Sequence, residues 1–559
     1  MRRALTTVAV VVLVLASLAP AVTAAPPSAS VSTVGSERVT DAPVSSTTMT
    51  DTSASNNTTD APPDPESDQL GWEDGYWYNE SLDVDQDDGL SQSELNATVA
   101  RAMARVELIR GLEFEQTVPV EIISRDAFAN ASSGGEVNET FRAFDDTKFE
   151  ALLLVGEEDD SLDVQQQNRG SSVLGYYSPS QDRIVIVSEN ASSPKIDEFT
   201  LAHELVHALQ DQHFDLASIR AQTRDGSNAN AGIVEGDASF VEQRYDRRCG
   251  EGGAWNGTCI RPPTDGGSGG GGSGPANLGV YFLKFQPYSD GPAFVAEQYR
   301  EGGWEAVNAV YEDLPASAEQ VIHPEKYGED APTDVTLQDR NSGDWERLRP
   351  PNRLDYATVG QAGVASMFVY PLYNEGRSGG RIVQPQNWLN YTDDGSVSSF
   401  DPLKYDFDYA AGWDGDRMHF YRNADGETAY VWRLVWDSPE EATEFRDGYV
   451  QVLQYWGAQE VSDRTYRISE GESEFADAFH VRVSGDTVTI VNAPTVDGLA
   501  EVRSSVTVQT ETETETATEP DPGTDTSASE TTTGAEAPGF SAITALVALL
   551  ATVLLVRRR

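Results

Sequence analysis

Two histidines set four residues apart in an apolar helical pattern constrain this chain more than any other feature. His203 and His207 lie in the segment from Lys195 to Phe214, which lacks glycine and proline and repeats apolar residues at helical spacing. Asp197 is a suitable N-cap, so the pattern predicts a helix with both histidines near its middle. Residues four apart share one helical face, and both imidazoles therefore point towards one spot, where they can bind a single cation. The alternative is an ordinary helix with two structural histidines.

The neighbouring carboxylates indicate metal-assisted hydrolysis. Glu204 follows the first histidine and lies beside the expected cation, where it can take a proton from a water molecule. A catalytic zinc needs a third protein ligand and keeps one coordination position for solvent. We favour Glu235 as this ligand because it opens a second amphipathic segment and has apolar neighbours, with Asp237 and Glu242 as alternatives.

Other residues near the motif have supporting roles in this interpretation. Asp211 lies four residues after His207, so we expect it to orient that ring. His213 is farther round the helix and is interpreted as structural. The segment from Leu174 to Ser188 alternates in the manner of a hairpin that turns between Ser178 and Asp182. A strand beside the helix is where a peptidase holds its substrate as an added strand.

With H-E-x-x-H on one helix and a glutamate on the next, the chain resembles the gluzincin group of zinc metallopeptidases between Leu174 and Tyr245. A longer series of segments is similar to an uncharacterised prokaryotic group of predicted metallopeptidases: HELVHALQDQHFD, VEGDA, the Pro287-Tyr288-x-x-Gly291 segment and ASAEQVIHPEKY. The resemblance implies a peptide or protein substrate and Zn²⁺ as cofactor, with His203, His207 and Glu235 as metal ligands and Glu204 as general base. His323 in the last segment is the expected oxyanion donor; the alternative is a His-Pro pair that ends a helix.

The charge of the chain indicates where it works. Its 91 acidic and 39 basic residues give a net charge of −52, spread along the whole chain. Phosphates are repelled by such a chain, which excludes a nucleic-acid partner. The acidity fits a protein that stays hydrated in concentrated salt, where self-repulsion is screened, and it resembles haloarchaeal surface proteins.

Both ends of the chain look like targeting segments. Residues 1–24 have two arginines, an apolar run and small residues, as a cleaved secretory signal has. Residues 538–559 contain Pro538-Gly539-Phe540, an apolar segment and three final arginines. This tail resembles the PGF sorting signal of archaeal surface proteins, which a sorting enzyme removes and a lipid anchor replaces. The alternative is a plain C-terminal membrane anchor, and either places the protein on the outer cell surface.

Two further features fit a secreted glycoprotein. The only cysteines, Cys249 and Cys259, are expected to form a disulfide outside the cell. N-glycosylation sequons occur at Asn56, Asn57, Asn79, Asn96, Asn130, Asn138, Asn190, Asn256 and Asn390.

Composition divides the remainder of the chain. Residues 25–70 read as a disordered spacer, and residues 501–537 as a Thr- and Glu-rich stalk. Between them we predict an α+β fold: a mostly helical zincin-like domain over residues 71–404, with an edge hairpin and a flexible glycine linker at 265–275, and a small ββαββ domain over residues 405–500. His419 and His480 lie in apolar strands of the small domain and are interpreted as structural.

An acidic loop near the N-terminus is a second candidate metal site. Asp83, Asp85, Asp87 and Glu94 stand at the spacing of a calcium-binding loop, although Asp88 replaces the usual glycine. The chain is thus expected to be a surface-anchored zinc metallopeptidase. The rival is a cell-envelope structural or binding protein whose zinc site is relict or structural.

Overall fold

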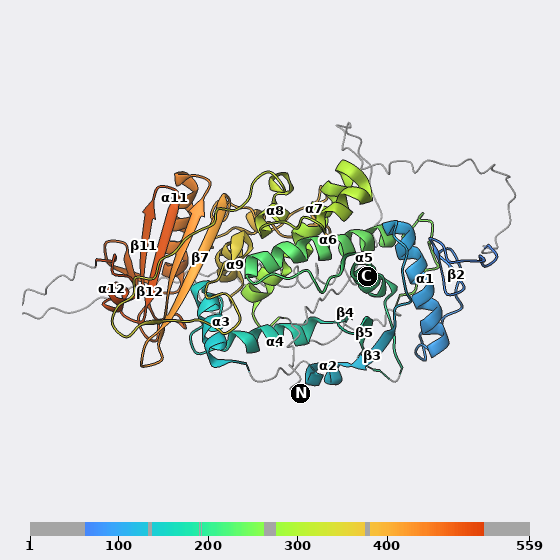
Figure 1. Ribbon diagram of the computed structural model, residues 1–559, viewed down its shortest axis with the longest axis horizontal. Helices are drawn as coiled ribbons and strands as arrows, with labels where there is room; N and C mark the ends of the chain where they lie inside the picture. The colour runs from blue at the N-terminus through green and yellow to red at the C-terminus, as the bar shows by residue number, and fades with distance from the viewer. Residues whose placement is uncertain are drawn as a thin grey trace, which may run out of the picture.

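The computed structural model describes residues 62–131, 137–188, 190–191, 193–261, 275–374 and 381–507. In this part of the chain the protein is an elongated α+β molecule, as predicted, with a seven-stranded sheet at one end and helix α1 at the other (Figure 1). The predicted signal peptide, most of the spacer, nearly all of the glycine linker and the sorting tail lie outside the described residues, as does the stalk beyond Thr507.

A small three-stranded sheet lies beside the central helices. Its strands are β3 (Val120–Ser124), β4 (Gly175–Ser178) and β5 (Arg183–Ser188), in the order β3-β5-β4. The β4–β5 pair is the predicted hairpin, and β4 forms an edge of the sheet. The neighbouring elements are β1 (Trp72–Glu73), β2 (Tyr76–Trp77), α1 (Gln92–Arg110), α2 (Arg125–Ala131), α3 (Glu139–Ala151) and α4 (Ser161–Ser172).

Three helices form the centre of the molecule. Helix α5 (Glu198–Phe214) begins as predicted, with the Asp197 carboxylate accepting a hydrogen bond from Phe199 N. Helix α6 is Arg224–Cys249, and α7 is Leu278–Val310 with a break at Gly302 and Gly303. Asn277 caps the start of α7, with its side chain accepting a hydrogen bond from Val280 N, and the helix continues through Pro287 and Pro292.

Helices α6 and α7 cross closely because glycines face each other. A Cβ added to Gly236 would lie 2.3 Å from the carbonyl oxygen of Gly291, and one added to Gly291 would lie 2.5 Å from that of Gly232. Backbone contact of this kind requires residues without side chains. Gly236 follows Glu235 directly, so this crossing also fixes the position of that glutamate.

The C-terminal part is a sheet with the order β6-β7-β8-β12-β11-β10-β9. Its strands are β6 (Glu346–Arg347), β7 (Trp413–Arg422), β8 (Thr428–Trp436), β9 (Gln459–Ser462), β10 (Thr465–Arg467), β11 (Ala478–Ser484) and β12 (Thr487–Ala493). The helices are α8 (Ala318–Ile322), α9 (Gly360–Tyr373), α10 (Pro385–Trp388), α11 (Pro439–Tyr455) and α12 (Gly498–Val502), with a short 3-10 turn, η1, at Pro324–Lys326.

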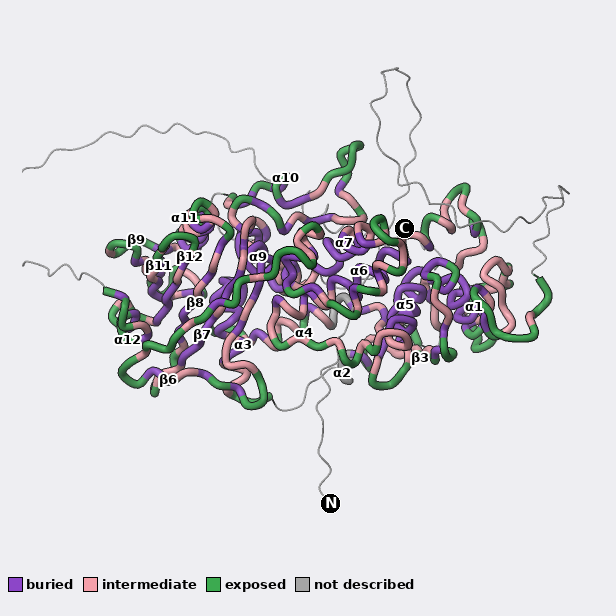
Figure 2. Tube along the Cα trace, turned by 45° about the horizontal axis from the view of Figure 1, so that its top comes forward, coloured by how far each residue is buried: buried purple, intermediate pink, exposed green. Residues whose placement is uncertain are grey.

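This sheet differs from the predicted ββαββ unit. The hairpin β9–β10 adds two strands, and β6 joins the sheet from a segment before residue 405. The largest hydrophobic cluster also includes residues on both sides of the predicted boundary, among them Phe282, Trp388 and Trp432. The buried trace is accordingly continuous from the sheet through α9 to the central helices (Figure 2). Periodicity within single elements does not reveal such shared packing.

Candidate metal centre

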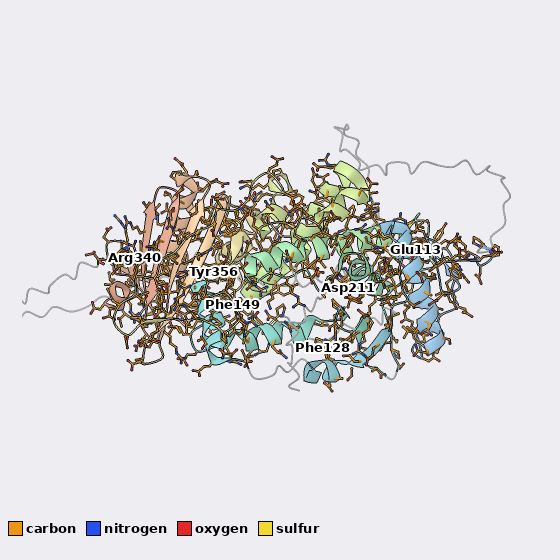
Figure 3. The ribbon with its side chains drawn as sticks, in the orientation of Figure 1. Glu113, Phe128, Phe149, Asp211, Arg340 and Tyr356 are labelled. Carbon is orange, nitrogen blue, oxygen red and sulfur yellow. A yellow bond between two sulfur atoms is a disulfide. The ribbon has the colours of Figure 1, made fainter. Side chains whose placement is uncertain are left out.

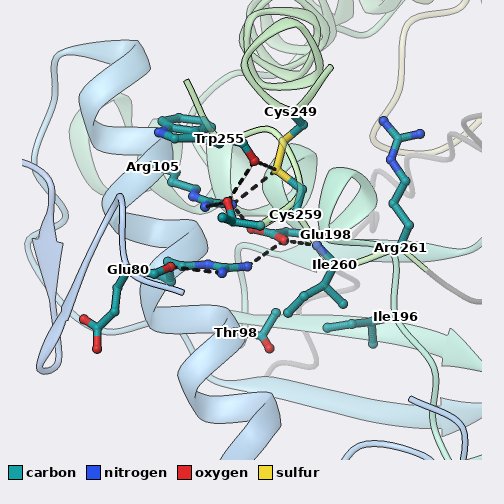
Figure 4. A network of polar contacts seen from close by, with 12 residues as sticks. Glu80, Thr98, Arg105, Ile196, Glu198, Cys249, Trp255, Cys259, Ile260 and Arg261 are labelled. Carbon is teal, nitrogen blue, oxygen red and sulfur yellow. Dashed lines mark hydrogen bonds and ion pairs between the residues drawn. A yellow bond between two sulfur atoms is a disulfide. The ribbon is translucent and has the colours of Figure 1, made fainter. Parts of the chain in front are cut away.

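The first residue of α5 is held by a buried ionic network. Glu198 is fully buried, and its carboxylate accepts hydrogen bonds from Arg101 Nη2 at 2.9 Å and Arg105 Nη1 at 2.7 Å (Figure 4). Tyr245 Oη donates to the same carboxylate at 2.5 Å. Helices α1, α5 and α6 are therefore joined at one anionic group, which fixes the end of the helix that carries both histidines.

The predicted disulfide closes a loop against this network. Cys249 at the end of α6 is bonded to Cys259, as expected for a secreted chain (Figure 4). The next residue, Ile260, donates its backbone N–H to Glu198 at 2.6 Å, and its carbonyl accepts from Glu198 N at 3.1 Å. The loop thus satisfies backbone groups that the start of α5 leaves without helical partners.

His203, His207 and Glu235 converge, as the sequence predicted. The Nε2 atoms of the two histidines are 3.1 Å apart, and they lie 3.4 and 3.5 Å from one carboxylate oxygen of Glu235. A tetrahedral zinc with bonds of about 2.0–2.1 Å separates its ligand atoms by about 3.3–3.4 Å. The spacing therefore matches three corners of a zinc tetrahedron.

The surroundings of Glu235 fit a divalent cation. Its side chain is fully buried, yet neither carboxylate oxygen accepts a hydrogen bond from the described residues. A buried carboxylate without donors is costly unless a positive charge faces it. Two neutral imidazoles and one carboxylate form a common donor set for Zn²⁺, so these residues fit the ion.

The second nitrogen of each imidazole has its own partner. His203 Nδ1 lies 3.2 Å from Glu242, and His207 Nδ1 lies 2.9 Å from Gln210 Oε1. Donation from Nδ1 to these oxygens leaves both Nε2 lone pairs directed at the centre. Glu242, an alternative third ligand in our prediction, therefore orients His203 instead.

Two predicted roles for aspartates are wrong. Asp237, the other alternative ligand, is buried in an ion pair with Arg110 at 2.9 Å and accepts from Tyr311 Oη and Gln210 Nε2. Asp211 accepts a hydrogen bond from Tyr177 Oη at 2.8 Å and does not contact His207. Gln210, three residues after His207, orients the ring in place of Asp211, four residues after it, because both positions lie on the same helical face as His207.

Charges at the centre are arranged to hold a cation. Burial lowers the pKa of His203, but the neighbouring carboxylates of Glu235 and Glu242 outweigh burial and raise this pKa to about 10. For Glu235 the balance reverses: burial raises the pKa, and His207 and His203 together lower it below the usual value. Both shifts arise because carboxylates face the imidazoles, and a zinc ion bound to the two Nε2 atoms would take the place of the proton that these carboxylates favour.

Glu204 lies beside the cluster and next to the edge strand. Its carboxylate accepts a hydrogen bond from the backbone N–H of Tyr177 on β4 at 2.9 Å. Burial is the largest influence on its pKa and raises it, against the two histidines, which lower it. The predicted base is thus held between the histidines and the strand.

The structure does not bring His323 into this cluster. The residue caps α8, and its ring contacts Gln361 Nε2 at 3.2 Å, with Glu325 and Asp406 at 3.7 and 3.9 Å. His213 is also turned away, with Nε2 at 2.8 Å from the carbonyl oxygen of Glu113. His213 is therefore structural, as predicted, and the contacts of His323 give no support to an oxyanion role.

Glu94, the last ligand of the predicted calcium loop, caps a helix instead. Glu94 completes a capping box with Ser91 at the start of α1, where its carboxylate accepts from Ser91 N at 2.8 Å. Among the described residues, Asp83, Asp85, Asp87 and Glu94 provide no three oxygens within 4.8 Å of one another. A capping box produces the same Ser-x-x-Glu spacing that we assigned to calcium.

Comparison with known proteins adds information at the C-terminal end. Residues 346–503 match the model of a domain of unknown function (DUF8575), and these bounds run from β6 to α12. Residues 537–559 match the PGF-CTERM motif. No curated protein and no solved structure matches the chain.

The PGF-CTERM motif identifies a class of protein. It marks archaeal secreted proteins that are processed at the C-terminus by a sorting enzyme and anchored to the cell surface. The protein is therefore a haloarchaeal-type surface protein, as its sequence predicted. Within the residues that the structure describes, no helix has the length and apolar character needed to cross a bilayer. The apolar segment of the sorting motif lies outside them.

Proposed function

We propose that this protein is a zinc-dependent peptidase at the outer cell surface. The observation that carries the proposal is the convergence of His203, His207 and Glu235 at the ligand spacing of a zinc tetrahedron. In the described part of the chain no fourth His, Cys, Asp or Glu joins this group. A site with three protein ligands and one free position is the arrangement of catalytic zinc.

The chain divides the work of hydrolysis between the metal and Glu204. Zinc, when bound, polarises a carbonyl group and lowers the pKa of water. Glu204 takes the proton of the attacking water and then gives it to the departing amine. Its raised pKa suits this exchange, because a base with a pKa nearer to neutrality both accepts and releases a proton readily.

Strand β4 offers a place for an extended peptide. Side chains and backbone groups alternate along a strand, so the N–H and C=O of Gly175 face the same side as the Tyr177 N–H, which points to Glu204. A peptide that pairs with the N–H and C=O of Gly175 would lie beside Glu204, whose carboxylate already accepts the Tyr177 N–H. Gly175 lacks a side chain there; a Cβ would lie 3.5 Å from Glu204 Cγ.

One observation favours the rival, a structural zinc in an envelope protein. The four residues of the centre are at most 2% exposed, which suits an ion that only stabilises the fold. A structural site, however, normally has four protein ligands, and the next histidine on α5, His213, contacts the carbonyl oxygen of Glu113 instead. The presence of only three protein ligands among the described residues therefore supports a catalytic zinc, whereas the burial of the site supports a structural zinc.

Metal analysis beside an activity assay separates the two. The purified protein and its Glu204→Gln variant are analysed for zinc, and casein hydrolysis is measured in concentrated salt, with Glu305→Gln as an exposed control on α7. We expect zinc in all three proteins and activity in the parent and the control alone. His207→Ala should lose the zinc. If the parent and the Glu204→Gln variant both contain zinc and neither hydrolyses casein, the zinc site is structural.

A further inference from the structure

A basic hollow lies on the C-terminal sheet, at one end of the molecule and away from the metal centre on the central helices. Figure 3 shows this separation, with Arg340 at the sheet end and Asp211 of α5 in the other half. The hollow measures about 260 Å³, and its charged lining residues are Arg340, Arg433, Arg482 and Arg503. His480 also lines it, and burial lowers the pKa of this imidazole. Hydroxyl groups of Ser484, Thr487, Thr489 and Ser505 complete the polar lining, which contains no Asp or Glu.

The strand register places these cations side by side. Thr489 of β12 pairs with Arg433 of β8 on one side and with Arg482 of β11 on the other. Directly paired residues have Cβ atoms about 4.5–5.5 Å apart and lie on one face of the sheet. His480 is two residues before Arg482 and shares that face. A parallel bridge between Arg340 and Arg503 adds a second pair of arginines.

The positive charge of the hollow is not neutralised within the described chain. Among the described residues, no carboxylate forms an ion pair with Arg340, Arg433, Arg482 or Arg503, whereas Arg417, next to Arg433 in the register, pairs with Asp334 at 2.9 Å. Arg433 and Arg503 reach only backbone carbonyls, at 3.3 and 3.5 Å. The buried Nε of Arg433 has no partner there.

Such a cluster is unfavourable by itself. Like charges side by side on a sheet destabilise it, and burial together with Arg340 lowers the pKa of Arg503. The chain has 91 acidic residues from which partners could come, yet none lines this hollow. These arginines destabilise the sheet by mutual repulsion, and a negatively charged ligand would remove that cost.

We propose that this hollow binds a phosphate-type oxyanion. Guanidinium groups match the oxygens of phosphate through paired N–H donors, and threonine hydroxyls donate further hydrogen bonds. The lining holds no large aromatic ring on which a base could stack, so the phosphate group itself is recognised. The phosphate has two possible sources: a soluble compound, or a lipid headgroup of the membrane to which the sorted C-terminus is anchored. The second source is on the same side of the chain, because Ser505 and Val506 line the hollow and the sorting motif begins 31 residues after Val506 (537 − 506).

The first test measures inorganic phosphate binding to the full chain in detergent and molar sodium chloride, by calorimetry. Because each residue loses charge-assisted hydrogen bonds to the anion, the Arg433→Gln/Arg482→Gln protein should bind phosphate at least about tenfold more weakly. Arg417→Gln, in the same row but ion-paired and outside the lining, is the matched control and should bind as the parent does. Thermal unfolding of each variant reports whether the fold is kept.

Two results would overturn the proposal. One is equal phosphate affinity in the parent and a folded double variant. The other is phosphate binding only after Glu511, Glu513 and Glu515 are changed to Gln, since the hollow would then be filled by the chain's own carboxylates.

Bilayers distinguish the two sources of phosphate. The full chain is reconstituted in phosphatidylglycerol and in phosphatidylcholine vesicles, and phosphate affinity is measured in both. If the parent binds inorganic phosphate more weakly in phosphatidylglycerol than in phosphatidylcholine vesicles, and the double variant shows no such difference, the anionic headgroup occupies the hollow. Equal affinity indicates a soluble phosphate compound. Because these measurements do not involve zinc or hydrolysis, their outcome is independent of the peptidase proposal.

Discussion

His207 presents Nε2 to the metal centre because Gln210 holds its other ring nitrogen at 2.9 Å. Gln210 is itself fixed, since its Nε2 donates to the carbonyl oxygen of Val234 at 2.9 Å and to Asp237 at 3.3 Å. The ring orientation of a ligand on α5 thus depends on the backbone of α6, one residue before Glu235.

We therefore predict that Gln210→Ala weakens zinc binding about 10- to 100-fold, the usual cost of removing such a partner. Gln212→Ala is the matched control, because that amide binds the backbone of Glu115 and Gln116 at the surface. Chelator competition measures the affinity of each protein, and thermal unfolding measures its stability. Equal zinc affinity in the two variants would show that Gln210 does not orient the ring.

A second residue, Asp416, makes stability depend on pH. Its buried carboxylate accepts from Gly360 N at 3.0 Å and Trp432 Nε1 at 3.1 Å, yet burial outweighs these bonds and raises its pKa from 3.8 to about 6. As pH rises, the unfolded chain loses this proton first. The folded state then binds more protons between about pH 4 and pH 6, so the free energy of unfolding falls across that window.

Asp416→Asn should remove this part of the pH dependence, which amounts to roughly 3 kcal/mol for the shift from 3.8 to about 6. Denaturant unfolding between pH 4 and pH 8 in constant salt gives the comparison with Asp408→Asn, an exposed control. If the free energy of unfolding changes with pH equally in the parent and in Asp416→Asn, Asp416 is not the group responsible.

At the scale of elements, the metal centre depends on how closely α6 and α7 approach. The glycines at their crossing leave no room for a side chain, and Glu235 stands beside one of them. The Pro287-Tyr288-x-x-Gly291 segment, which we had read only as part of a resemblance, supplies the other side of this crossing.

Gly236→Ala should force the two helices apart, because its Cβ would lie 2.3 Å from the Gly291 carbonyl oxygen. Overpacking of this kind costs typically about 1–3 kcal/mol, and we expect lower zinc affinity as Glu235 moves with the helix. Gly250→Ala, at the end of the same helix, meets only ordinary contacts at 3.5 Å and serves as control. Unchanged stability and zinc content in Gly236→Ala would refute the close crossing.

At the scale of the whole molecule, the net charge of −52 sets the conditions of stability. Screening limits repulsion to about 3 Å at 1 M salt and extends it to about 10 Å at 0.1 M. The folded chain holds its carboxylates closer together than the unfolded chain does, so repulsion acts mainly against folding.

We expect the unfolding temperature to fall continuously as sodium chloride is lowered from molar to about 0.1 M, by roughly 2–4 °C for each kcal/mol of added repulsion. Differential scanning calorimetry measures the change, and an uncharged osmolyte at equal osmolality is the control. A constant unfolding temperature across this range would contradict a salt-adapted fold.

The sequence alone determined what depends on local spacing and composition. The helical period of α5, the alternation of β4 and β5, and the disulfide are short-range features, and the structure has all of them. The cell-surface location follows from the composition of the tail and from its sorting motif.

Only the tertiary structure decided which groups meet. Asp237 and Glu235 stand two residues apart on α6, yet α1 and Arg110 neutralise the first, while the second faces the histidines. The partners of the imidazoles, the shared core across residue 404 and the row of arginines on the sheet all join segments far apart in the chain. Contacts at long sequence separation leave no periodic trace, because each is selected by packing and charge in three dimensions.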